Sequence, residues 1–264
     1  MMTGMSARTV DWTGLGSPRG KTPGAARAGA SDAPPAGAPG AEGLRERKKR
    51  LMRQQLSDTA TEMFMERGFD AVRVAEVAEA CGVSEKTVFN YFPTKESLVL
   101  DRWDATMASL RTGLADPGIV PVEAAVRILD TELNAMTSWL AGQDDPGQAI
   151  ASVRRFGALI QATPALRAHQ RDVLDRLIEA AAGILAVRAG VSRDDPEPQI
   201  AATALLGLWE VQFRSLRKFL DEARTPAQIY EAVTADVHRA AQLIGAGLNS
   251  FEAFRPEHQS AERT

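Results

Sequence analysis

The sequence predicts an all-α protein in which an N-terminal three-helix head precedes a larger C-terminal helical domain. Apolar residues recur at helical spacing from about Leu44 to Phe251. Ala, Leu, Glu, Arg and Gln dominate this part of the chain, and these residues favour helix. Strand signals are weak, since the chain has 2 Tyr and few β-branched runs.

Clusters of Pro, Gly, Asp and Thr mark where one helix ends and the next begins. Gly68 follows the first helix, Ser84 and Thr94 have the position of N-caps, and Thr163 and Thr225 are N-caps followed directly by Pro. The expected helices cover about 44–67, 74–80, a short helix opening at Ser84, 95–113, 121–141, 148–162, 164–189, 198–223 and 226–249.

The two ends of the chain contain few large apolar side chains, so they cannot bury enough surface to offset their ordering entropy. We expect disordered tails over 1–43 and 252–264. The remaining chain divides into a head over 44–100 and a second domain over 101–251.

Composition excludes several classes of function. Cys81 is the single cysteine, so an intramolecular disulfide framework is excluded and a reducing cytosol is favoured. The chain has no apolar run near the roughly 20 residues that span a bilayer, and no pattern of a secretory signal. His169, His238 and His258 lie far apart, which predicts no metal site. We expect a cytoplasmic, nucleoid-associated protein without a cofactor. It also lacks the phosphate loop or nucleophile elbow of an enzyme.

Two short helices joined by a turn are predicted after the first long helix. Val74, Val77 and Ala78 form one face of the first short helix. Gly82 permits a tight turn, because glycine tolerates backbone angles that other residues avoid. Ser84 can then cap the second helix with its hydroxyl. This is the pattern of a helix-turn-helix, whose second helix enters the major groove of DNA.

The second short helix separates into an inward and an outward face. Val88 and Phe92 lie four residues apart and face inward. Asn can pair with adenine, Lys can reach the acceptors of guanine, and hydroxyls can bind phosphate oxygens. Lys95, in the first turn of the next expected helix, is a further candidate for phosphate. The residues left for DNA are Glu85, Lys86, Thr87, Phe89, Asn90 and Tyr91.

The segment VAEVAEACGVSEKTVFNYFPTKESL resembles the TetR family of ligand-responsive repressors over about 47–100. The residues that carry the resemblance are Gly68-Phe69, Gly82-Val83-Ser84, Thr87, Tyr91-Phe92, Lys95-Glu96 and Leu98. The resemblance implies that Glu85, Lys86, Phe89 and Asn90 face bases, whereas Ser84, Thr87, Tyr91 and Lys95 hold the DNA backbone. It also implies a small ligand in the C-terminal domain and dimerisation through the last two helices.

Two positions depart from the family pattern. Arg73 stands where the family often has a small hydroxyl residue that caps the second helix, and we expect it to contact phosphate instead. Phe89 stands where Tyr is commoner, which leaves an apolar contact with a base such as the thymine methyl group. These departures affect which sequence is bound rather than whether DNA is bound.

A basic run precedes the motif, opposed only by Glu46. It could contact phosphates or an adjacent groove, although a solvated helix face explains it too. The helix-turn-helix beside it favours DNA. The run consists of Arg45, Arg47, Lys48, Lys49, Arg50 and Arg53.

The C-terminal domain is predicted to dimerise and to hold a ligand. The helices at 198–223 and 226–249 carry more apolar surface than one neighbouring helix covers. This favours a homodimer, which would bind a palindromic operator of double-stranded DNA. The alternative is that both are interior helices of a monomer. The stretch 154–168 resembles a subgroup whose domain binds acyl-CoA-like molecules, with Arg154, Arg155 and Arg167 as candidates for the anionic head group. A small hydrophobic or acyl-CoA-like ligand would contact Trp103, Met107, Trp139, Phe156, Leu159, Trp209 and Phe213, unless these residues only pack the core.

The alternatives for the function are a ligand-gated repressor, an enzyme on a helical scaffold, and a constitutive DNA binder without an effector. The motif favours the first, and ordinary core packing keeps the third open.

Overall fold

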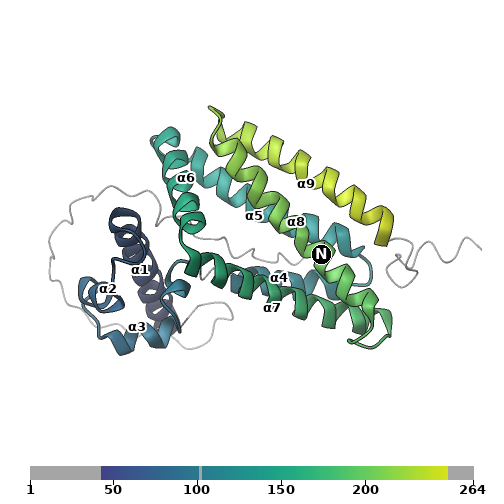
Figure 1. The fold of residues 1–264 in the computed structure, drawn as a ribbon, viewed down its shortest axis with the longest axis horizontal. Helices are drawn as coiled ribbons and strands as arrows, with labels where there is room; N and C mark the ends of the chain where they lie inside the picture. The colour runs from purple at the N-terminus through teal and green to yellow at the C-terminus, as the bar shows by residue number, and fades with distance from the viewer. Residues whose placement is uncertain (1–42, 101–102, 249–264) are drawn as a thin grey trace, which may run out of the picture. The chain divides into compact units, whose positions relative to one another are not determined.

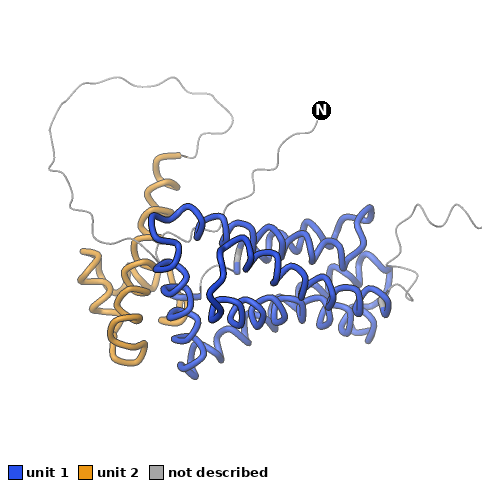
Figure 2. Tube along the Cα trace, turned by 90° about the horizontal axis from the view of Figure 1, so that it is seen from above, with its two compact units in different colours: residues 1–12, 99–264 blue, residues 13–98 orange. Residues whose placement is uncertain are grey.

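The computed structural model describes residues 43–100 and 103–248, and in these residues every regular element is helical, which confirms the predicted all-α fold. The expected tails at 1–43 and 252–264 lie outside the described residues, apart from Gly43. The chain divides into two compact units, with the boundary between residues 98 and 99 (Figure 2). Within the described residues no helix is long and apolar enough to cross a membrane.

The head contains three α-helices and one short 3-10 helix (Figure 1). These are α1 (Leu44–Arg67), α2 (Val74–Ala80), α3 (Glu85–Tyr91) and η2 (Glu96–Leu98). Gly82, in the turn between α2 and α3, has a φ of 67°, in the left-handed region that favours glycine. The core of the head contains Leu56, Ala60 and Phe64 of α1, together with Val77, Ala78, Val88 and Phe92 from the faces predicted for the two short helices.

The helix expected over 95–113 is wrong, because the chain makes two separate elements there. Thr94 and Ser97 exchange hydrogen bonds between side chain and backbone N–H, both at 3.2 Å, and this closes the single turn η2. The carbonyl of Leu98 accepts a hydrogen bond from the hydroxyl of Ser57 at 2.8 Å instead of continuing a helix. The next helix, α4, begins only at Trp103.

The C-terminal unit, which is unit 1 in Figure 2, is a bundle of six helices within the described residues. They are α4 (Trp103–Ala115), α5 (Pro121–Ala141), α6 (Pro146–Ala162), α7 (Pro164–Ala189), α8 (Pro196–Leu220) and α9 (Pro226–Leu248). α8 packs against both α7 and α9, and α5 packs against α4 and α9 (Figure 1). α6 and α8 begin two residues earlier than expected, since Pro146 and Pro196 each take the first turn of a helix.

Arg188 on α7 closes one end of this bundle. Its guanidinium donates to the carbonyl oxygens of Asp116 at 2.9 Å, Leu114 at 3.3 Å and Pro117 at 3.4 Å. These carbonyls belong to the last turn of α4 and to the two residues after it, where the helix supplies no N–H partner. Arg188 thus fixes the turn between α4 and α5 onto α7.

Candidate DNA-reading helix and ligand cavity

Helix α3 is held at its N-terminus by Ser84. The Ser84 hydroxyl oxygen accepts a hydrogen bond from the backbone N–H of Thr87 at 3.1 Å, and it lies 2.8 Å from the Thr87 hydroxyl. This is the cap that the sequence predicts. It fixes the start of a helix of 7 residues, which is too short to be stable alone.

The outward face of α3 is polar and exposed, as its spacing predicted. Lys86 and Asn90 are exposed, and Phe89 exposes 44% of its surface, an unusual fraction for a large apolar side chain. Val88 and Phe92 are buried against the head. Two base-reading types, an ammonium and an amide, are therefore free of the core on one helix face.

The C-terminal end of α3 is fixed by Arg53, which the sequence analysis had counted only among the basic residues of the first helix. Its guanidinium donates to the carbonyl of Tyr91 at 2.7 Å and lies 4.7 Å from the centre of the Phe92 ring. Arg53 therefore fixes the C-terminal end of α3 to α1. Its place in the sequence, two helical turns after Arg45, does not indicate that role.

Lys95 lies against the core of the head. Its ammonium donates to the carbonyl of Phe69 at 2.6 Å and lies 4.3 Å from the Phe69 ring centre and 5.4 Å from that of Phe64. The expected first turn of a long helix, with free N–H groups for phosphate, is absent from this place in the described structure because only η2 forms there. Lys95 thus has a structural role that the sequence did not indicate.

Arg73 precedes α2 and has an exposed side chain, as a phosphate contact requires. Its backbone N–H donates to the Glu76 carboxylate at 2.8 Å, and Arg67 donates to the same carboxylate at 2.7 Å. The backbone bond from Arg73, and then the bond from Arg67, lower the pKa of Glu76 from 4.5 to about 2. Glu76 therefore ties the start of α2 to the backbone of Arg73 and to the guanidinium of Arg67.

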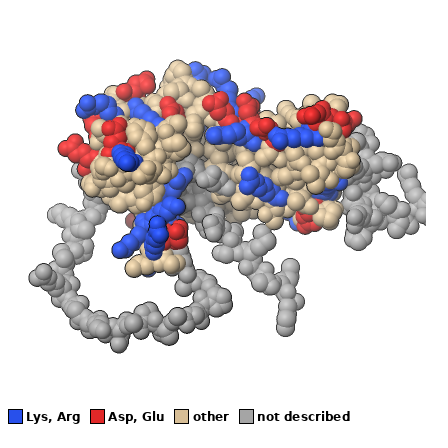
Figure 3. Space-filling view, turned by 90° about the horizontal axis from the view of Figure 1, so that it is seen from below, with Lys and Arg blue, Asp and Glu red and all other residues tan. Residues whose placement is uncertain are grey.

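The start of α1 carries a dense group of Lys and Arg side chains (Figure 3). Arg45, Arg47 and Lys48 are all exposed, on a part of α1 that precedes its first buried residue, Leu56. This surface has the charge and exposure that phosphate binding needs.

An apolar cavity of about 200 Å³ lies in the C-terminal unit. Five helices, α4 to α8, contribute to its wall. Trp103 and Phe213 form one side, with their ring centres 5.8 Å apart in an edge-to-face arrangement. Of the predicted ligand residues, Trp103, Phe156 and Phe213 line this cavity, together with Leu133, Met136, Val153, Ile160, Leu216 and Leu220.

One carboxyl group lies in this apolar wall. Glu132 on α5 accepts a hydrogen bond from the Thr106 hydroxyl at 2.6 Å and another from the indole N–H of Trp209 at 3.1 Å. Burial raises the pKa of Glu132, and the two hydrogen bonds oppose that rise. Trp209, predicted as a ligand contact, is almost fully buried, joins α8 to Glu132 and lines the second cavity described next.

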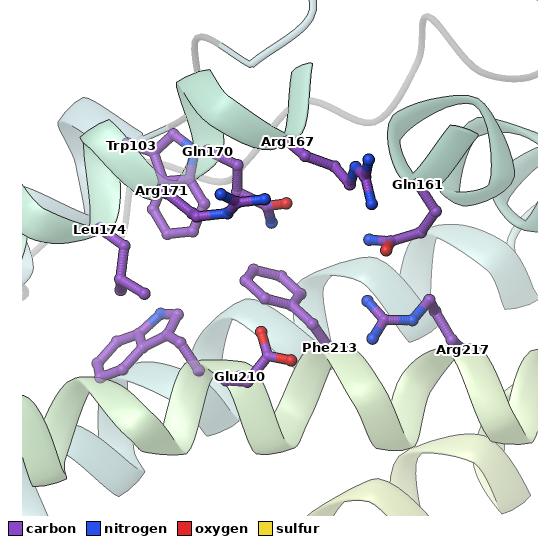
Figure 4. Close-up of a pocket in the computed structure, with 10 residues that line it drawn as sticks. Trp103, Gln161, Arg167, Gln170, Arg171, Leu174, Glu210, Phe213 and Arg217 are labelled. Atoms are coloured by element: carbon purple, nitrogen blue, oxygen red, sulfur yellow. The ribbon is translucent and has the colours of Figure 1, made fainter. Parts of the chain in front are cut away.

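A second cavity of about 280 Å³ adjoins the first (Figure 4). The two share the lining residues Trp103, Gln161, Gln170, Phe213 and Arg217. The charged residues that line the second cavity are Arg167 and Arg171 from α7 and Glu210 and Arg217 from α8. Glu210 is paired with Arg214 at 3.0 Å, and Figure 4 shows Arg167, Gln161 and Arg217 at the same end of the cavity. Together the cavities reach the size of ligand pockets, roughly 300–1,000 Å³.

Other predicted ligand residues are not brought to these cavities. Met107, Trp139 and Arg155 line neither of them. Arg155 donates to the Ser152 hydroxyl at 3.3 Å, and Arg154 lies 3.9 Å from the Asp221 carboxylate. Met107, Trp139, Arg154 and Arg155 therefore lie on other faces of their helices. Their aromatic, apolar or basic character does not by itself indicate which face of a helix turns inward.

Glu132, Arg171 and Arg217 line the cavities without having been predicted from the sequence. A signal existed for the first of them. Glu132 falls on the inward stripe of its helix, between Leu129 and Met136, where an acid is exceptional. The two arginines have no such signal, since each lies on a helix rich in basic residues.

A capped second helix that exposes base-reading side chains, on a head separate from a helical bundle, defines a helix-turn-helix regulator of transcription. Residues 56–101 match the family described as bacterial regulatory proteins, tetR family, and residues 145–248 match the MftR C-terminal domain. The chain belongs to the TetR family and is a DNA-binding transcriptional regulator, not a member of an enzyme family.

Two curated relatives are similar over much of their length. A Mycobacterium tuberculosis protein, named as the mycofactocin biosynthesis transcriptional regulator MftR, is 27% identical over 204 residues, which cover 77% of this chain and 94% of the relative. The HTH-type transcriptional regulator TcmR of Streptomyces glaucescens is 30% identical over 161 residues, covering 60% of this chain and 69% of the relative.

Among solved structures, NalD of Pseudomonas aeruginosa, described as the secondary repressor of the MexAB-OprM multidrug efflux pump, is 21% identical. It aligns with a TM-score of 0.44 over 72% of this chain and 96% of its own.

Proposed function

We propose that this regulator is a repressor that leaves its operator when a small molecule occupies the cavities of the C-terminal unit. The observation that carries the proposal is an apolar cavity continuous in its lining with a cavity that holds three arginines. Protein cores that serve stability alone are closely packed, because a cavity lowers the free energy of unfolding. A cavity of this size therefore favours a role in ligand binding.

The ligand we propose is amphipathic and anionic, such as an acyl-CoA-like molecule. Arg167, Arg171 and Arg217 would bind its phosphate or carboxylate group, and the apolar cavity would hold its acyl chain. Trp103 and Phe213, which line both cavities, would contact the junction of the two parts.

For the DNA complex we propose a homodimer on a palindromic operator. Each α3 would enter a major groove, with the centres of the half-sites one helical turn, roughly 34 Å, apart. We expect Glu85, Lys86, Phe89 and Asn90 to face bases. Phosphates would be held by Ser84, Thr87, Tyr91, Lys95, Arg73 and the start of α1 at Arg45, Arg47 and Lys48. We expect the protein to bind its operator in the cytoplasm, at the nucleoid.

Release follows from a shift of population. A ligand that prefers the conformation with a different spacing of the two reading helices draws the dimer away from DNA by its difference in affinity for the two states. A tenfold loss of operator affinity requires about 1.4 kcal/mol of such coupling.

The experiment is a titration of the operator complex, on a fragment selected from genomic DNA, with lauroyl-CoA, laurate and coenzyme A. We expect lauroyl-CoA to release DNA at lower concentration than laurate, and coenzyme A alone to have little effect. Arg171→Ala should weaken the response to lauroyl-CoA, whereas Arg193→Ala, which removes an exposed arginine in the loop between α7 and α8, should not. A complex that survives all three compounds, with none of them bound to the free protein, would favour a constitutive DNA binder.

A further inference from the structure

Glu132 is the only carboxylate among the described residues that line the apolar cavity. On α5 it stands in the inward stripe with Leu129, Leu133 and Met136, and it remains partly exposed toward the cavity. A leucine in its place would fill the wall without desolvating a polar group, so packing alone does not explain an acid there.

The carboxyl group is held rigidly from two sides. Thr106 on α4 bonds its Oε1 and Trp209 on α8 bonds its Oε2, so both oxygens have fixed positions. A carboxylate has about four acceptor positions, and these two bonds use one on each oxygen. Acceptor capacity is therefore left on both oxygens of a group that borders the cavity.

A plain hydrocarbon chain in this cavity would leave that capacity without water and without a partner, which is unfavourable. A ligand group that donates a hydrogen bond would satisfy it. Hydroxyl and amine groups share this chemistry, and either end of an otherwise apolar chain can carry one.

Along α8, Arg217 lies away from the point at which Trp209 bonds to Glu132. Trp209, the partner of Glu132, and Arg217, which lines both cavities, are eight residues apart on α8. At 1.5 Å per residue this is about 12 Å along the helix axis. A single extended molecule can therefore reach the arginines with one end and Glu132 with the other.

We propose that Glu132 is a specificity-determining residue, and that the effector is a bifunctional molecule: an anionic head at the arginines and a hydroxyl or amine farther along its chain, bonded to Glu132. The proposal rests on the proposed function, since it assumes that the cavities hold the effector.

The test compares three carboxylates of equal chain length, laurate, ω-hydroxylaurate and ω-aminolaurate, for binding to the full chain by calorimetry. We expect the wild-type protein to bind at least one of the two substituted acids about tenfold more tightly than laurate. In Glu132→Leu this preference should be lost or reversed, with laurate bound at least as tightly as before. Glu123→Leu, an exposed acid on the same helix, should leave the preference unchanged.

A purely structural role for Glu132 would change the melting temperature and all three affinities alike, without changing their ratio. If Glu132→Leu does not fold, Glu132→Gln keeps an oxygen acceptor for Trp209 but no charge, and it should lose the preference for the amine. Equal binding of the three acids by the wild type, or an unchanged ratio in the folded Glu132 variants, would overturn the proposal while leaving the proposed function intact. Failure of every acid and acyl-CoA to bind the wild type would overturn both.

Discussion

Lys95 illustrates how one side chain can serve stability at a place where charge alone indicates DNA binding. Its ammonium is held by the Phe69 carbonyl and two aromatic rings, yet an ammonium has three donors, so the bond to Phe69 leaves further donors for a phosphate. Both roles can be measured separately, because one concerns unfolding and the other concerns counterion release.

We predict that Lys95→Met destabilises the protein by about 1.5–3 kcal/mol, the range for a hydrogen bond to a charged group, and lowers its melting temperature. If Lys95 also contacts phosphate, the slope of log affinity against log salt should fall by about one. Lys48→Met on the exposed start of α1 is the contrast: it should change the salt slope without changing stability. An unaltered melting temperature in Lys95→Met would show that the Phe69 contact contributes nothing.

Glu76 makes stability depend on pH. Its pKa in the folded protein, about 2, lies below the ordinary value of 4.5 because Arg73 and Arg67 stabilise the charged form. The unfolded state therefore binds more protons over this interval, and the stabilisation, complete above about pH 4.5, is lost as the pH falls toward 2.

Thermal unfolding of the wild type and of Glu76→Gln at a series of pH values should reveal this pH-dependent stabilisation. The variant should melt below the wild type at neutral pH, and the two curves should converge as the pH falls through that interval. Glu79→Gln, an exposed acid on the same helix, should follow the wild type throughout. Parallel curves for Glu76→Gln and wild type at every pH would contradict the assignment.

At the scale of the element, α3 depends on contacts at both ends. Ser84 bonds to its start and Arg53 to its end, so the side chains of its middle project from a helix that is held at both termini. This rigidity is what a base-reading helix needs, since a hydrogen bond to a base edge tolerates little displacement.

We predict that Asn90→Ala keeps the fold and loses discrimination at one base pair, by about 1–3 kcal/mol. Selection of bound sequences from a random library would measure this as a relaxed position in the operator. Asn134→Ala, an exposed amide on α5, is the matched control. An unchanged preferred sequence for Asn90→Ala would remove Asn90 from the base-reading residues.

The sequence predicted elements better than it predicted what lies between them. The bounds of α1, α2, α5 and α7 follow from apolar spacing with Gly and Pro at their ends, which are local properties. The break after η2 could not be predicted, because it depends on Ser57, 41 residues earlier, reaching the Leu98 carbonyl. The cavity could not be predicted either, since it is enclosed by side chains from five helices.

At the scale of the whole molecule, the apolar surface that the bundle leaves exposed supports the proposed dimer. Leu243 on α9 exposes 80% of its surface and Ile200 on α8 exposes 64%. We predict that Leu243→Glu shifts the protein toward monomers in sedimentation and weakens binding to a two-site operator. Val187→Glu, an equally exposed apolar residue on α7, should sediment as the wild type does. Dimers of full strength in Leu243→Glu would exclude this end of α9 from the interface.

The hydrogen bond from Ser57 to Leu98 ends the head, and the next two residues, Val99 and Leu100, already line the apolar cavity. The boundary between the two units therefore falls immediately before the cavity lining begins. Two glycines inserted after Leu98 would lengthen the connection between them. Operator affinity and ligand affinity should both survive the insertion, and only the response of one to the other should disappear.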